Sequence, residues 1–597
     1  MLAGVGPGQG ASAALAAAYH QWLPALTRLA AAVPHGSRWD SATFHSSPEA
    51  REGDSREAAM SSTFGGRLTQ RKEATAPRGM DPVRCCIVGS GPAGFYAAAK
   101  LLRRWGSHAT VDIIERLPTP YGLVRSGVAP DHADTKNVTG QFSRVGSDPR
   151  CRFLGNVQLG RHVSVEELQS MYNVVVLAYG SQGDRSLDIP GENLPGVLSA
   201  KQFVGWYNGH PDHSTLPIDL SRTRSVAVLG LGNVALDVAR VLGAPWKELA
   251  ATDITSDAVR QLQTSVVQAV HIVGRRGPVQ AAYTPKELRE VLSMPSLRLR
   301  LHDPERSLNL SPSDAEDAAE HRRMRRNYEV LKKAYEDRGR LPTKDGQREL
   351  HLHFWKRPME LRGNAKDGVQ SLVLEDTVVE QLADGRRTLR GTGQVSEVPV
   401  DLVLKAVGYK SLALPGVPFD SDRGVVPNEA GRVLDDNGEP MPGLYVTGWL
   451  RRGPTGIIAT NLHDAEAEVA SGEEDNESLL LKYMADQRLW GHVSSKSGAP
   501  RHSPDDELQR DAEEAVDTIT DDLTNGRVPL LPPGAPEGEA GLQPLLAKRG
   551  VRVVSWDDWE AIDAEERSRG EEKGKVREKF TSVEEMIAFL DDRAASA

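Results

Sequence analysis

The segment Gly89-Ser-Gly91-Pro-Ala-Gly94 has the glycine spacing of a phosphate-binding turn between a strand and a helix. Gly89 permits a tight turn, Gly91 lets the backbone approach a diphosphate, and Gly94 lets the helix pack closely on the strand. The N–H groups of the turn and the N-terminus of the following helix would stabilise the phosphates. The motif therefore predicts a dinucleotide site at the start of an α/β unit.

An acidic residue follows this motif at the distance expected for a ribose contact. Glu115 lies 21 positions after Gly94, at the end of the next apolar run, where a carboxylate would bind both ribose hydroxyls. The same carboxylate would repel a 2′-phosphate, so the first site is predicted to hold FAD or NAD rather than NADP. The alternative is a glycine-rich turn without a ligand.

A second glycine motif, Gly230-Leu-Gly-Asn-Val-Ala235, has the same form, with Ala at the third position, as the fingerprint allows. Its unit ends in Val-Gly-Arg275-Arg276-Gly and has no acid at the strand tip. Two guanidinium groups there would pair with a 2′-phosphate, so the second site is predicted to select NADP over NAD. The alternative is that both arginines are ordinary surface charges.

A third motif, Gly448-Trp449-Leu-Arg-Arg-Gly-Pro-Thr-Gly456-Ile457-Ile458, precedes a helix that is expected to start near residue 459. Backbone N–H groups at that helix N-terminus could face an isoalloxazine ring and stabilise negative charge on reduced flavin. Trp449 could pack on the ring. The alternative is a core tryptophan at the end of a strand.

These motifs need elements that hold them, and the surrounding sequence predicts two βαβ units. Each unit contains an apolar run, a glycine turn, a helical run and a second apolar run. The first unit covers 85–88, 95–103 and 111–114, and the second covers 226–229, 234–242 and 270–273. Further strands are expected at 174–178, 402–406 and 444–447. Two such units predict an α/β protein with two nucleotide ligands.

Composition restricts the class of protein. The chain has 597 residues, of which 39% are hydrophobic and 26% charged, values typical of a globular protein with large cores. No run approaches the roughly 18 apolar residues of a membrane-spanning helix. The 72 basic and 82 acidic residues leave a net charge of −10, which disfavours a nucleic-acid-binding protein.

Cysteine and histidine spacing gives no metal or dithiol signature. Cys85, Cys86 and Cys151 form no Cys-x-x-Cys pair, which disfavours a dithiol redox centre, a zinc site and a disulfide scaffold. His351 and His353 alternate in a strand-like stretch, but no third ligand stands nearby, so no metal site is predicted.

The first 80 residues differ from the rest of the sequence. Through residue 47 they contain a single acid, Asp40, and are rich in Ala, with apolar residues at helical spacing. An acid-poor amphipathic leader is typical of a mitochondrial or chloroplast transit peptide. The alternatives are a disordered tail or an over-extended gene model in which Met60 or Met80 is the true start.

Motifs at many separate places resemble the mitochondrial adrenodoxin reductase family of NADPH–ferredoxin oxidoreductases. The resemblance runs from about residue 81 to the C-terminus. Its motifs are YGLVRSGVAPDH from Tyr121, FVGWYN from Phe203, NVALDVAR from Asn233, KELRE from Lys286 and RGPTGIIAT from Arg452. Chance similarity between dinucleotide-binding folds does not produce agreement at so many positions.

The resemblance implies an α/β fold of two dinucleotide-binding (Rossmann-like) domains, like that of glutathione reductase, with the NADP domain inserted in the FAD domain. The expected parts are 81–187 and 406–597 for the FAD domain and 188–405 for the NADP domain. A stretch at about 472–504 is longer than the family leads us to expect and is interpreted as an insertion. The family usually has Gln where Leu231 stands, so a side-chain contact to NADP is expected to be lost while the backbone cradle remains.

The resemblance also implies which residues contact each cofactor. It implies FAD contacts for Ala93, Glu115, Leu123, Leu159, Trp449, Gly456, Ile457 and Ile458. It implies NADP contacts for Leu231, Gly232, Asn233, Val234, Arg275, Arg276, Glu287 and Gly456.

The reaction that the resemblance implies is hydride transfer from NADPH to FAD, followed by release of single electrons to a [2Fe–2S] ferredoxin. Such transfer needs alignment and exclusion of water more than a side-chain acid. His132 and Asp237 lie in family motifs associated with the flavin site. They are expected either to relay a proton or to form structural hydrogen bonds.

An acidic ferredoxin requires a basic docking surface. Arg322 and Arg326 stand one turn apart on an expected basic helix, and the resemblance adds Arg289 as a partner contact. The alternative is a solvated helix face. We further expect a monomer in the mitochondrial matrix, or peripheral at the inner membrane, with the chloroplast as the alternative location.

Two other classes compete with this interpretation. An electron-input subunit like that of glutamate synthase would normally carry cysteine clusters, which are absent here. A non-catalytic flavin-binding protein would bind FAD without being bleached by NADPH. The missing Cys-x-x-Cys pair excludes a disulfide reductase.

Overall fold

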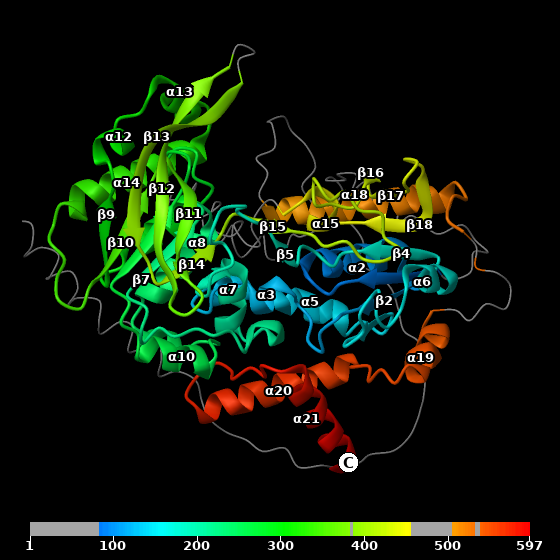
Figure 1. Ribbon diagram of the computed structural model, residues 1–597. Helices are drawn as coiled ribbons and strands as arrows, with labels where there is room; N and C mark the ends of the chain where they lie inside the picture. The colour runs from blue at the N-terminus through cyan, green and yellow to red at the C-terminus, as the bar shows by residue number, and fades with distance from the viewer. Residues whose placement is uncertain (1–82, 383–385, 455–503, 530, 532–537, 597) are drawn as a thin grey trace, which may run out of the picture. The chain divides into compact units, whose positions relative to one another are not determined.

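Two parallel β-sheets organise the residues that the computed structural model describes, 83–382, 386–454, 504–529, 531 and 538–596 (Figure 1). The predicted leader at 1–80, residues 472–503 of the predicted insertion, and Gly456, Ile457 and Ile458 lie outside these ranges. One sheet takes strands from both sides of the segment that builds the other sheet. The predicted fold, with one dinucleotide-binding domain inserted in another, is therefore confirmed.

The first sheet has seven strands in the order β16-β17-β18-β4-β1-β2-β3. Their bounds are β1 Val83–Val88, β2 Ala109–Ile114, β3 Cys151–Leu154, β4 Val174–Leu177, β16 Asn428–Glu429, β17 Arg432–Leu434 and β18 Pro440–Val446. β1 to β4 and β18 run parallel, whereas β16 and β17 pair antiparallel at one edge. All four residues of β4 are buried, because helices cover both faces of a parallel sheet; this explains its unbroken apolar run.

Helices from distant parts of the sequence cover the two faces of this sheet. One core contains Cys85 and Ile87 together with residues of α2 (Pro92–Trp105) and α18 (Pro504–Thr524), and Lys100 on α2 pairs with Glu513 on α18. The opposite core contains residues of α6 (Val165–Met171) and α19 (Glu539–Lys548). The helix expected at 95–103 is thus confirmed as α2, which starts earlier because Pro92 suits the first helical turn.

The second sheet has six parallel strands in the order β6-β14-β7-β8-β10-β9. Their bounds are β6 Val197–Ser199, β7 Ser225–Leu229, β8 Ala269–Val273, β9 Leu297–Leu301, β10 Arg348–His353 and β14 Leu402–Lys405. The helices of this domain are α7 Ala200–Asn208, α8 Asn233–Gly243, α9 Trp246–Ala250, α10 Ser256–Gln263, α11 Pro285–Ser293, α12 Pro304–Leu308, α13 Pro312–Glu320 and α14 Arg322–Ala334. A short π-helix at Tyr335–Gly339 follows α14.

A three-stranded antiparallel sheet, which the sequence did not predict, packs on the second sheet. It consists of β11 (Lys356–Asn364), β12 (Gly368–Gln381) and β13 (Arg387–Pro399). Leu361, Leu372 and Leu374 join Ala227 and Val273 in one buried core, so this small sheet covers the face of β7 and β8 opposite the main helical core. The chain crosses between the two domains at the antiparallel pair β5 (Gly183–Asp184) and β15 (Tyr409–Lys410).

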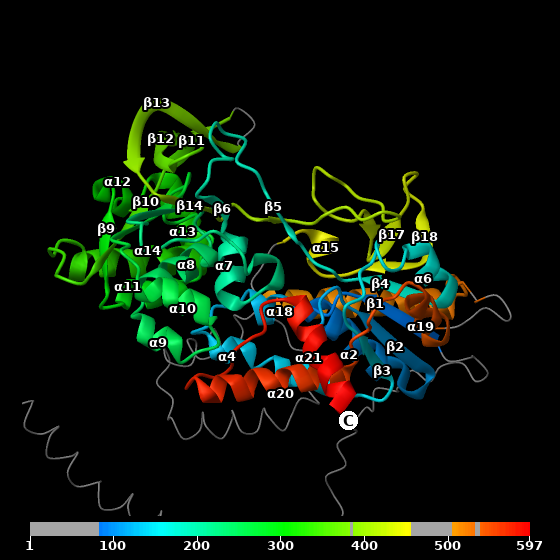
Figure 2. The same cartoon turned by 60° about the horizontal axis from the view of Figure 1, so that its bottom comes forward.

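The C-terminal helices contact both domains. α20 (Trp556–Glu572) and α21 (Val583–Ser596) are red in Figures 1 and 2, and α20 lies beside α3 (Leu123–Ser126) and α5 (Thr139–Gly146). The short helix α4 (Ala133–Lys136) lies between α3 and α5 in the sequence. Glu566 on α20 is fully buried and accepts hydrogen bonds from Arg125 on α3. The buried ammonium of Lys579 lies 2.9 Å from Asp253, just before α10. The end of the chain thus ties the inserted domain to the first one.

Candidate functional site

The turn between β1 and α2 requires glycine at two positions. Gly89 has a φ of +111°, and a Cβ there would lie 2.6 Å from the carbonyl oxygen of Ala178. A Cβ on Gly94 would lie 2.0 Å from the carbonyl oxygen of Gly89. At Gly91, by contrast, an added Cβ would meet no described atom within 4 Å, and the N-cap residue of α2 offers no side-chain cap. The first N–H groups of α2 therefore have no side-chain cap from that residue and can bind a diphosphate.

Glu115 follows the end of β2 and braces this turn. Its Oε2 accepts hydrogen bonds from the backbone N (3.0 Å) and the Oγ (2.8 Å) of Ser90, and its Oε1 accepts one from the backbone N of Leu117 (3.1 Å). A carboxylate offers about four acceptor sites, so these bonds leave capacity for ribose hydroxyls. The sequence identified the residue but not its contacts with the turn.

The other predicted FAD residues in the described ranges come from four separate elements. Ala93 is in the first turn of α2, Leu123 begins α3, buried Leu159 follows β3, and Trp449 begins α15 (Trp449–Arg452). α3 lies close to the glycine turn, since a Cβ on Gly122 would lie 3.1 Å from the Cα of Gly91. Trp449 is partly buried against the core of the first sheet; its contact with flavin stays a prediction.

Two buried hydroxyl groups near the carboxyl ends of β4 and β18 lack a hydrogen-bond partner among the described residues. They belong to Tyr179 and Thr447, and burial raises the pKa of Tyr179. Buried polar groups are nearly always paired, and ligands of α/β sheets bind at the carboxyl ends of the strands. These orphan groups, together with the uncapped turn, fit a site that a dinucleotide completes.

The turn between β7 and α8 repeats this arrangement. Gly230 has a φ of +145°, and a Cβ there would lie 2.2 Å from the carbonyl oxygen of Ala406. Gly232 faces open space, and no side chain caps α8. Asn233 Oδ1 accepts a hydrogen bond of 2.8 Å from the backbone N of Thr284, which ties the turn to the start of α11.

The departure at Leu231 changes the side chain but keeps the backbone in place. The Leu231 carbonyl accepts hydrogen bonds from the backbone N of Ala282 (2.8 Å) and of Tyr283 (3.1 Å). Its side chain lies on Gly274, where an added Cβ would be 2.1 Å from the Leu231 Cδ1. The neighbouring Val234 is partly buried and packs against the core of the domain. This turn can therefore present its backbone without a polar side chain at position 231.

Arg275 and Arg276 follow the end of β8, and both are exposed. Their backbone is fixed, because the Arg275 carbonyl accepts a hydrogen bond from Thr377 Oγ1 (2.8 Å) and the Arg276 carbonyl accepts one from the backbone N of Trp355 (3.1 Å). Neither guanidinium has an ion pair with any residue that the structure describes. Two guanidiniums on a fixed backbone, without an ion pair among the described residues, fit the recognition of a phosphate monoester.

A network of charged side chains joins the two domains. Its centre is Arg240 on α8, whose side chain is 3% exposed. Arg240 donates hydrogen bonds to Asp131 from the first domain, to Asp237 (2.8 Å) on α8 and to Glu287 (3.3 Å) on α11. The predicted site residues Asp237 and Glu287 are thus brought together with His132 around an arginine that the sequence interpretation did not single out.

His132 lies among acidic side chains from two helices of the inserted domain, α8 and α11. Its Nε2 lies 3.1 Å from a carboxylate oxygen of Glu290 and 3.7 Å from one of Glu287, and its Nδ1 lies 4.0 Å from Asp237. Burial disfavours the charged imidazole, but these acids outweigh burial and raise the pKa of His132. Burial raises the pKa of Asp237 against the opposing charge of Arg240. The spacing of Asp237 and Arg240, one helical turn apart, is the signal that could have revealed the network.

The three predicted partner contacts lie on two helices that pack together, α11 and α14. Arg289 is exposed on α11, and Arg322 and Arg326 are half-buried on α14, which confirms the expected helix. Of their neighbours, Arg323 donates hydrogen bonds to the carbonyls of Ala281 and Tyr283 and is structural. α11 also carries Glu287 and Glu290 of the charged network, so this basic surface adjoins the domain junction.

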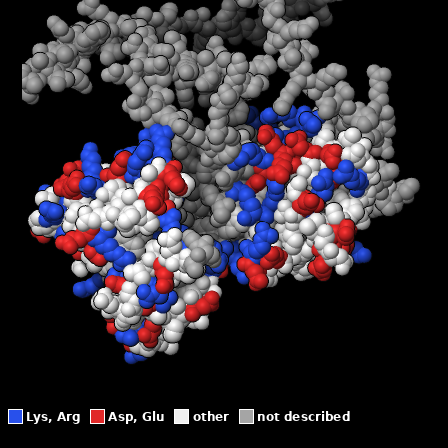
Figure 3. Space-filling view, turned by 90° about the horizontal axis from the view of Figure 1, so that it is seen from above, with Lys and Arg blue, Asp and Glu red and all other residues white. Residues whose placement is uncertain are grey.

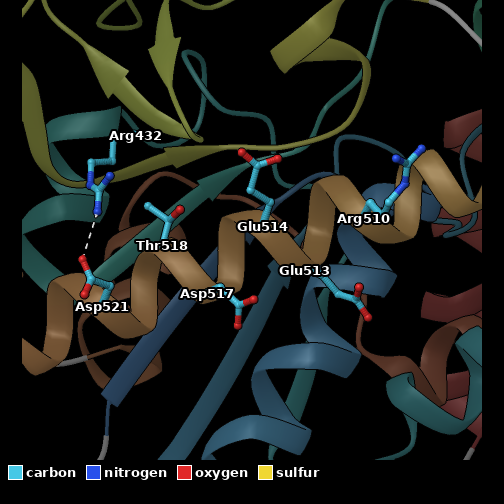
Figure 4. A pocket seen from close by; sticks show the side chains of 7 residues that line it. All are labelled: Arg432, Arg510, Glu513, Glu514, Asp517, Thr518 and Asp521. Carbon is cyan, nitrogen blue, oxygen red and sulfur yellow. Dashed lines mark ion pairs between the residues drawn. The ribbon is translucent and has the colours of Figure 1, made fainter. Parts of the chain in front are cut away.

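The face of the molecule that Figure 3 shows is mixed in charge. In Figure 3, basic and acidic side chains are interspersed over the described atoms of that view. A hollow along α18 is lined by Arg432, Arg510, Glu513, Glu514, Asp517, Thr518 and Asp521 (Figure 4). Because acids dominate its lining and Arg432 is paired with Asp521, this hollow suits neither a diphosphate nor an acidic protein.

The expectation that no third ligand lies near His351 and His353 is wrong. His271 and His302 stand next to this pair. The strand order places β10 between β8 and β9, which brings together histidines that are far apart in the sequence.

Comparisons with known proteins agree with this geometry. The pyridine nucleotide-disulphide oxidoreductase family model matches residues 83–294. A mitochondrial NADPH:adrenodoxin oxidoreductase of Arabidopsis thaliana is 45% identical over 85% of this chain and 95% of its own length, and that of Homo sapiens is 42% identical over 85% and 91%. The structure of Mycobacterium tuberculosis FprA in complex with NADPH covers 85% of this chain and 99% of its own, with 35% identity and a TM-score of 0.69.

The interleaved domains and their two glycine turns define a pyridine nucleotide-dependent oxidoreductase with two dinucleotide sites. All three cysteines are buried and unpaired, so within this class a dithiol reductase is excluded. At 45% identity over most of both chains, the chain belongs to the NADPH:adrenodoxin oxidoreductase family. None of the helices in the described ranges combines the length and hydropathy that a membrane span requires.

Proposed function

We propose that this protein is an FAD-dependent NADPH–ferredoxin oxidoreductase that oxidises NADPH and reduces an iron–sulfur ferredoxin. The observation that carries the proposal is the pair of uncapped glycine turns, one followed by Glu115 and the other by Arg275 and Arg276. An acid selects a dinucleotide with free ribose hydroxyls, and two arginines select one with a 2′-phosphate. The same chain therefore distinguishes its two dinucleotides by charge.

The β1–α2 turn would hold the FAD diphosphate, and Glu115 would hold the ribose. FAD, when bound, accepts a hydride and returns electrons one at a time. Trp449 would pack beside the flavin, and Ala93, Leu123 and Leu159 would line the cofactor. Gly456, Ile457 and Ile458 are proposed as further contacts on the basis of the family resemblance alone.

The β7–α8 turn would hold the NADPH diphosphate through the backbone of residues 231–234, and Arg275 and Arg276 would bind the 2′-phosphate. Asn233 would act indirectly, because its side chain fixes the start of α11. Hydride transfer depends on holding the two rings in line and excluding water. The ion pairs between Arg240 and Asp131 join α8 to the first domain and would help to hold that alignment.

His132 and Asp237 are assigned to this alignment rather than to a proton relay. The three carboxylates near the His132 imidazole belong to Asp237, Glu287 and Glu290, and Asp237 and Glu287 also contact Arg240; among the described residues, none of these contacts leads to a predicted flavin residue. Because buried Arg240 pairs with acids from the first domain, from α8 and from α11, it stabilises the arrangement of these three parts. The alternative, a proton relay, would give the His132→Gln variant a solvent isotope effect different from that of the wild type.

The partner is proposed to be an acidic [2Fe–2S] ferredoxin that docks on Arg289, Arg322 and Arg326. Opposite charges would steer the encounter and set its salt dependence. These arginines lie close to the charged network, because α11 carries Arg289 as well as Glu287 and Glu290 and packs against α14. The protein is proposed to act as a monomer.

The proposed location is the mitochondrial matrix, with peripheral association at the inner membrane. The acid-poor sequence through residue 47 and the mitochondrial names of two relatives support this location. A fluorescent protein fused behind residues 1–80 should enter mitochondria. Import into chloroplasts instead would establish the alternative.

Anaerobic titration of the purified protein with NADPH tests the function. The expected result is a yellow protein with one FAD, bleached by NADPH and not by equimolar NADH, that reduces cytochrome c only when a [2Fe–2S] ferredoxin is added. A protein that binds FAD but is not bleached would be a non-catalytic flavoprotein. Bleaching without any stimulation by a ferredoxin would contradict the assigned acceptor.

A further inference from the structure

Four histidines meet on one face of the second sheet, near the carboxyl ends of β9 and β10 and the middle of β8. His271 lies on β8 and pairs in register with His351 on β10. His353 is two residues further along β10 and therefore points to the same face. His302 follows β9, where its backbone N donates to the carbonyl of Leu352 (3.1 Å), which aligns it with His353. Three neighbouring strands thus supply four imidazoles to one place.

Nitrogen atoms of these rings face each other at short distances. The Nδ1 of His271 lies 3.0 Å from the Nε2 of His353, and the Nε2 of His302 lies 2.9 Å from the Nδ1 of His351. Imidazole nitrogens held about 2.0–2.1 Å from a tetrahedral zinc ion stand roughly 3.3 Å apart. One ligand atom from each of His271, His351 and His353 lies within 4.8 Å of the other two. Coordination of one ion by all four rings would require them to turn out of their stacked arrangement, in which the ring planes of His302 and His353 differ by 17° and those of His271 and His351 by 24°.

A carboxylate orients one of the four rings. The Nε2 of His351 lies 3.0 Å from the Oε2 of Glu349 and donates to it, which leaves the lone pair of Nδ1 directed toward His302. Glu349 is itself fixed by Arg300 and Thr343. Histidines that bind metals commonly donate their other ring nitrogen to a carboxylate in this way.

The four rings differ in their exposure to solvent. His353 is 3% exposed and His271 8%, whereas His302 is exposed, so a cation could enter from the side of His302.

We propose that His271, His302, His351 and His353 bind one divalent transition-metal ion of the kind that prefers imidazole, with Zn²⁺ as the representative ligand. In each pair of facing ring nitrogens, one proton otherwise lies between the two nitrogens in a hydrogen bond. The metal ion would take the place of these protons. The site is separate from both glycine turns and does not depend on the proposed oxidoreductase activity. The bound ion would link β8, β9 and β10 close to the end of β8, which Arg275 follows.

The test is calorimetric titration of the full-length, FAD-loaded protein with Zn²⁺, without NADPH or ferredoxin. The wild type should bind one equivalent of Zn²⁺ that the double variant His302→Gln/His353→Gln does not bind. Glu349→Gln should retain the stoichiometry with roughly 10–100-fold weaker binding. Mg²⁺, which prefers oxygen ligands, should not bind at this site.

The matched control is His108→Gln, because His108 is exposed on the other domain; its zinc isotherm should equal that of the wild type. His302→Gln alone covers the case in which the buried substitution prevents folding, since His302 is exposed, and it should weaken binding at least tenfold. The proposal is overturned if the folded double variant binds as much Zn²⁺ as the wild type. It is equally overturned if zinc binding disappears only when the acid-rich group around His132 is altered.

Discussion

Replacing Arg275 and Arg276 by alanine should convert the protein from an NADPH-specific enzyme to one that barely distinguishes NADPH from NADH. Both guanidiniums stand at the tip of β8 without an ion pair in the described part of the chain, while hydrogen bonds from Thr377 and Trp355 fix their backbone. The substitution therefore removes charge without disturbing the strand. The turn between β7 and α8, which is proposed to hold the diphosphate, is left intact.

The magnitude follows from the exposure of the two side chains. A hydrogen bond to a charged group contributes about 1.5–3 kcal/mol, and we take the lower end for each arginine because both are exposed to solvent. The pair then contributes about 3 kcal/mol, or roughly 10²-fold in kcat/KM for NADPH. The kcat/KM for NADH, which lacks the 2′-phosphate, should change by less than about twofold on the same reasoning.

Steady-state reduction of ferricyanide with each nucleotide measures the two values of kcat/KM, and FAD content confirms that the variant is folded. Arg222→Ala is the matched control, because Arg222 is exposed in the same domain but precedes β7, at the opposite end of the strands. The reasoning is refuted if the NADPH-to-NADH ratio does not change. It is also refuted if both nucleotides lose efficiency equally.

The remaining predictions concern docking, flavin retention and pH. Reversing Arg322 and Arg326 to glutamate should slow ferredoxin-dependent cytochrome c reduction at least tenfold and abolish its salt dependence, with NADPH-to-ferricyanide rates unchanged; parallel loss of both activities would contradict docking. Gly94→Ala should yield protein without FAD, because the new Cβ would lie 2.0 Å from a carbonyl oxygen, whereas Gly140→Ala, with open space around it, should remain yellow. The raised pKa of His132 stabilises the folded state at a pH below the unfolded value of about 6.5, and this contribution is lost as the pH rises through the folded pKa. The melting temperatures of wild type and His132→Gln should therefore converge between pH 6 and pH 9, and a constant difference would contradict the shift.

The elements that the sequence predicted well are those whose signals are local. The glycine turns, their strands and their helices were identifiable because φ angles above zero and close backbone contacts at Gly89 and Gly230 admit almost no other residue. The sequence also placed Glu115 and the two arginines after the ends of their strands, as the structure has them, while their contacts with the cofactors stay predictions. The observed ends of these elements differ from the predicted ends by a few residues, because capping and proline placement, rather than hydrophobicity, decide where an element begins and ends.

The elements that the sequence did not reveal depend on contacts between distant segments. Arg240 meets Asp131 across 109 positions, and His271 meets His353 across 82 positions because β10 inserts between β8 and β9. Neither contact can be predicted from the sequence without knowing how the strands and helices are arranged. The antiparallel sheet on the second domain was missed for a different reason, since its outer strand β13 is exposed along most of its length and has no apolar run.

The interleaving of the two sheets has a consequence for biosynthesis. The second sheet is complete once β14 has been made, at Lys405, but β4 in the first sheet waits for its partner β18, which ends at Val446. During vectorial translation, in which amino-terminal segments emerge first, the inserted domain can fold on the ribosome while the flanking one is still an incomplete sheet with an open edge. Flavin uptake would then be one of the last steps in maturation, and a chain truncated before residue 440 should accumulate as a folded inserted domain attached to an aggregation-prone half-sheet.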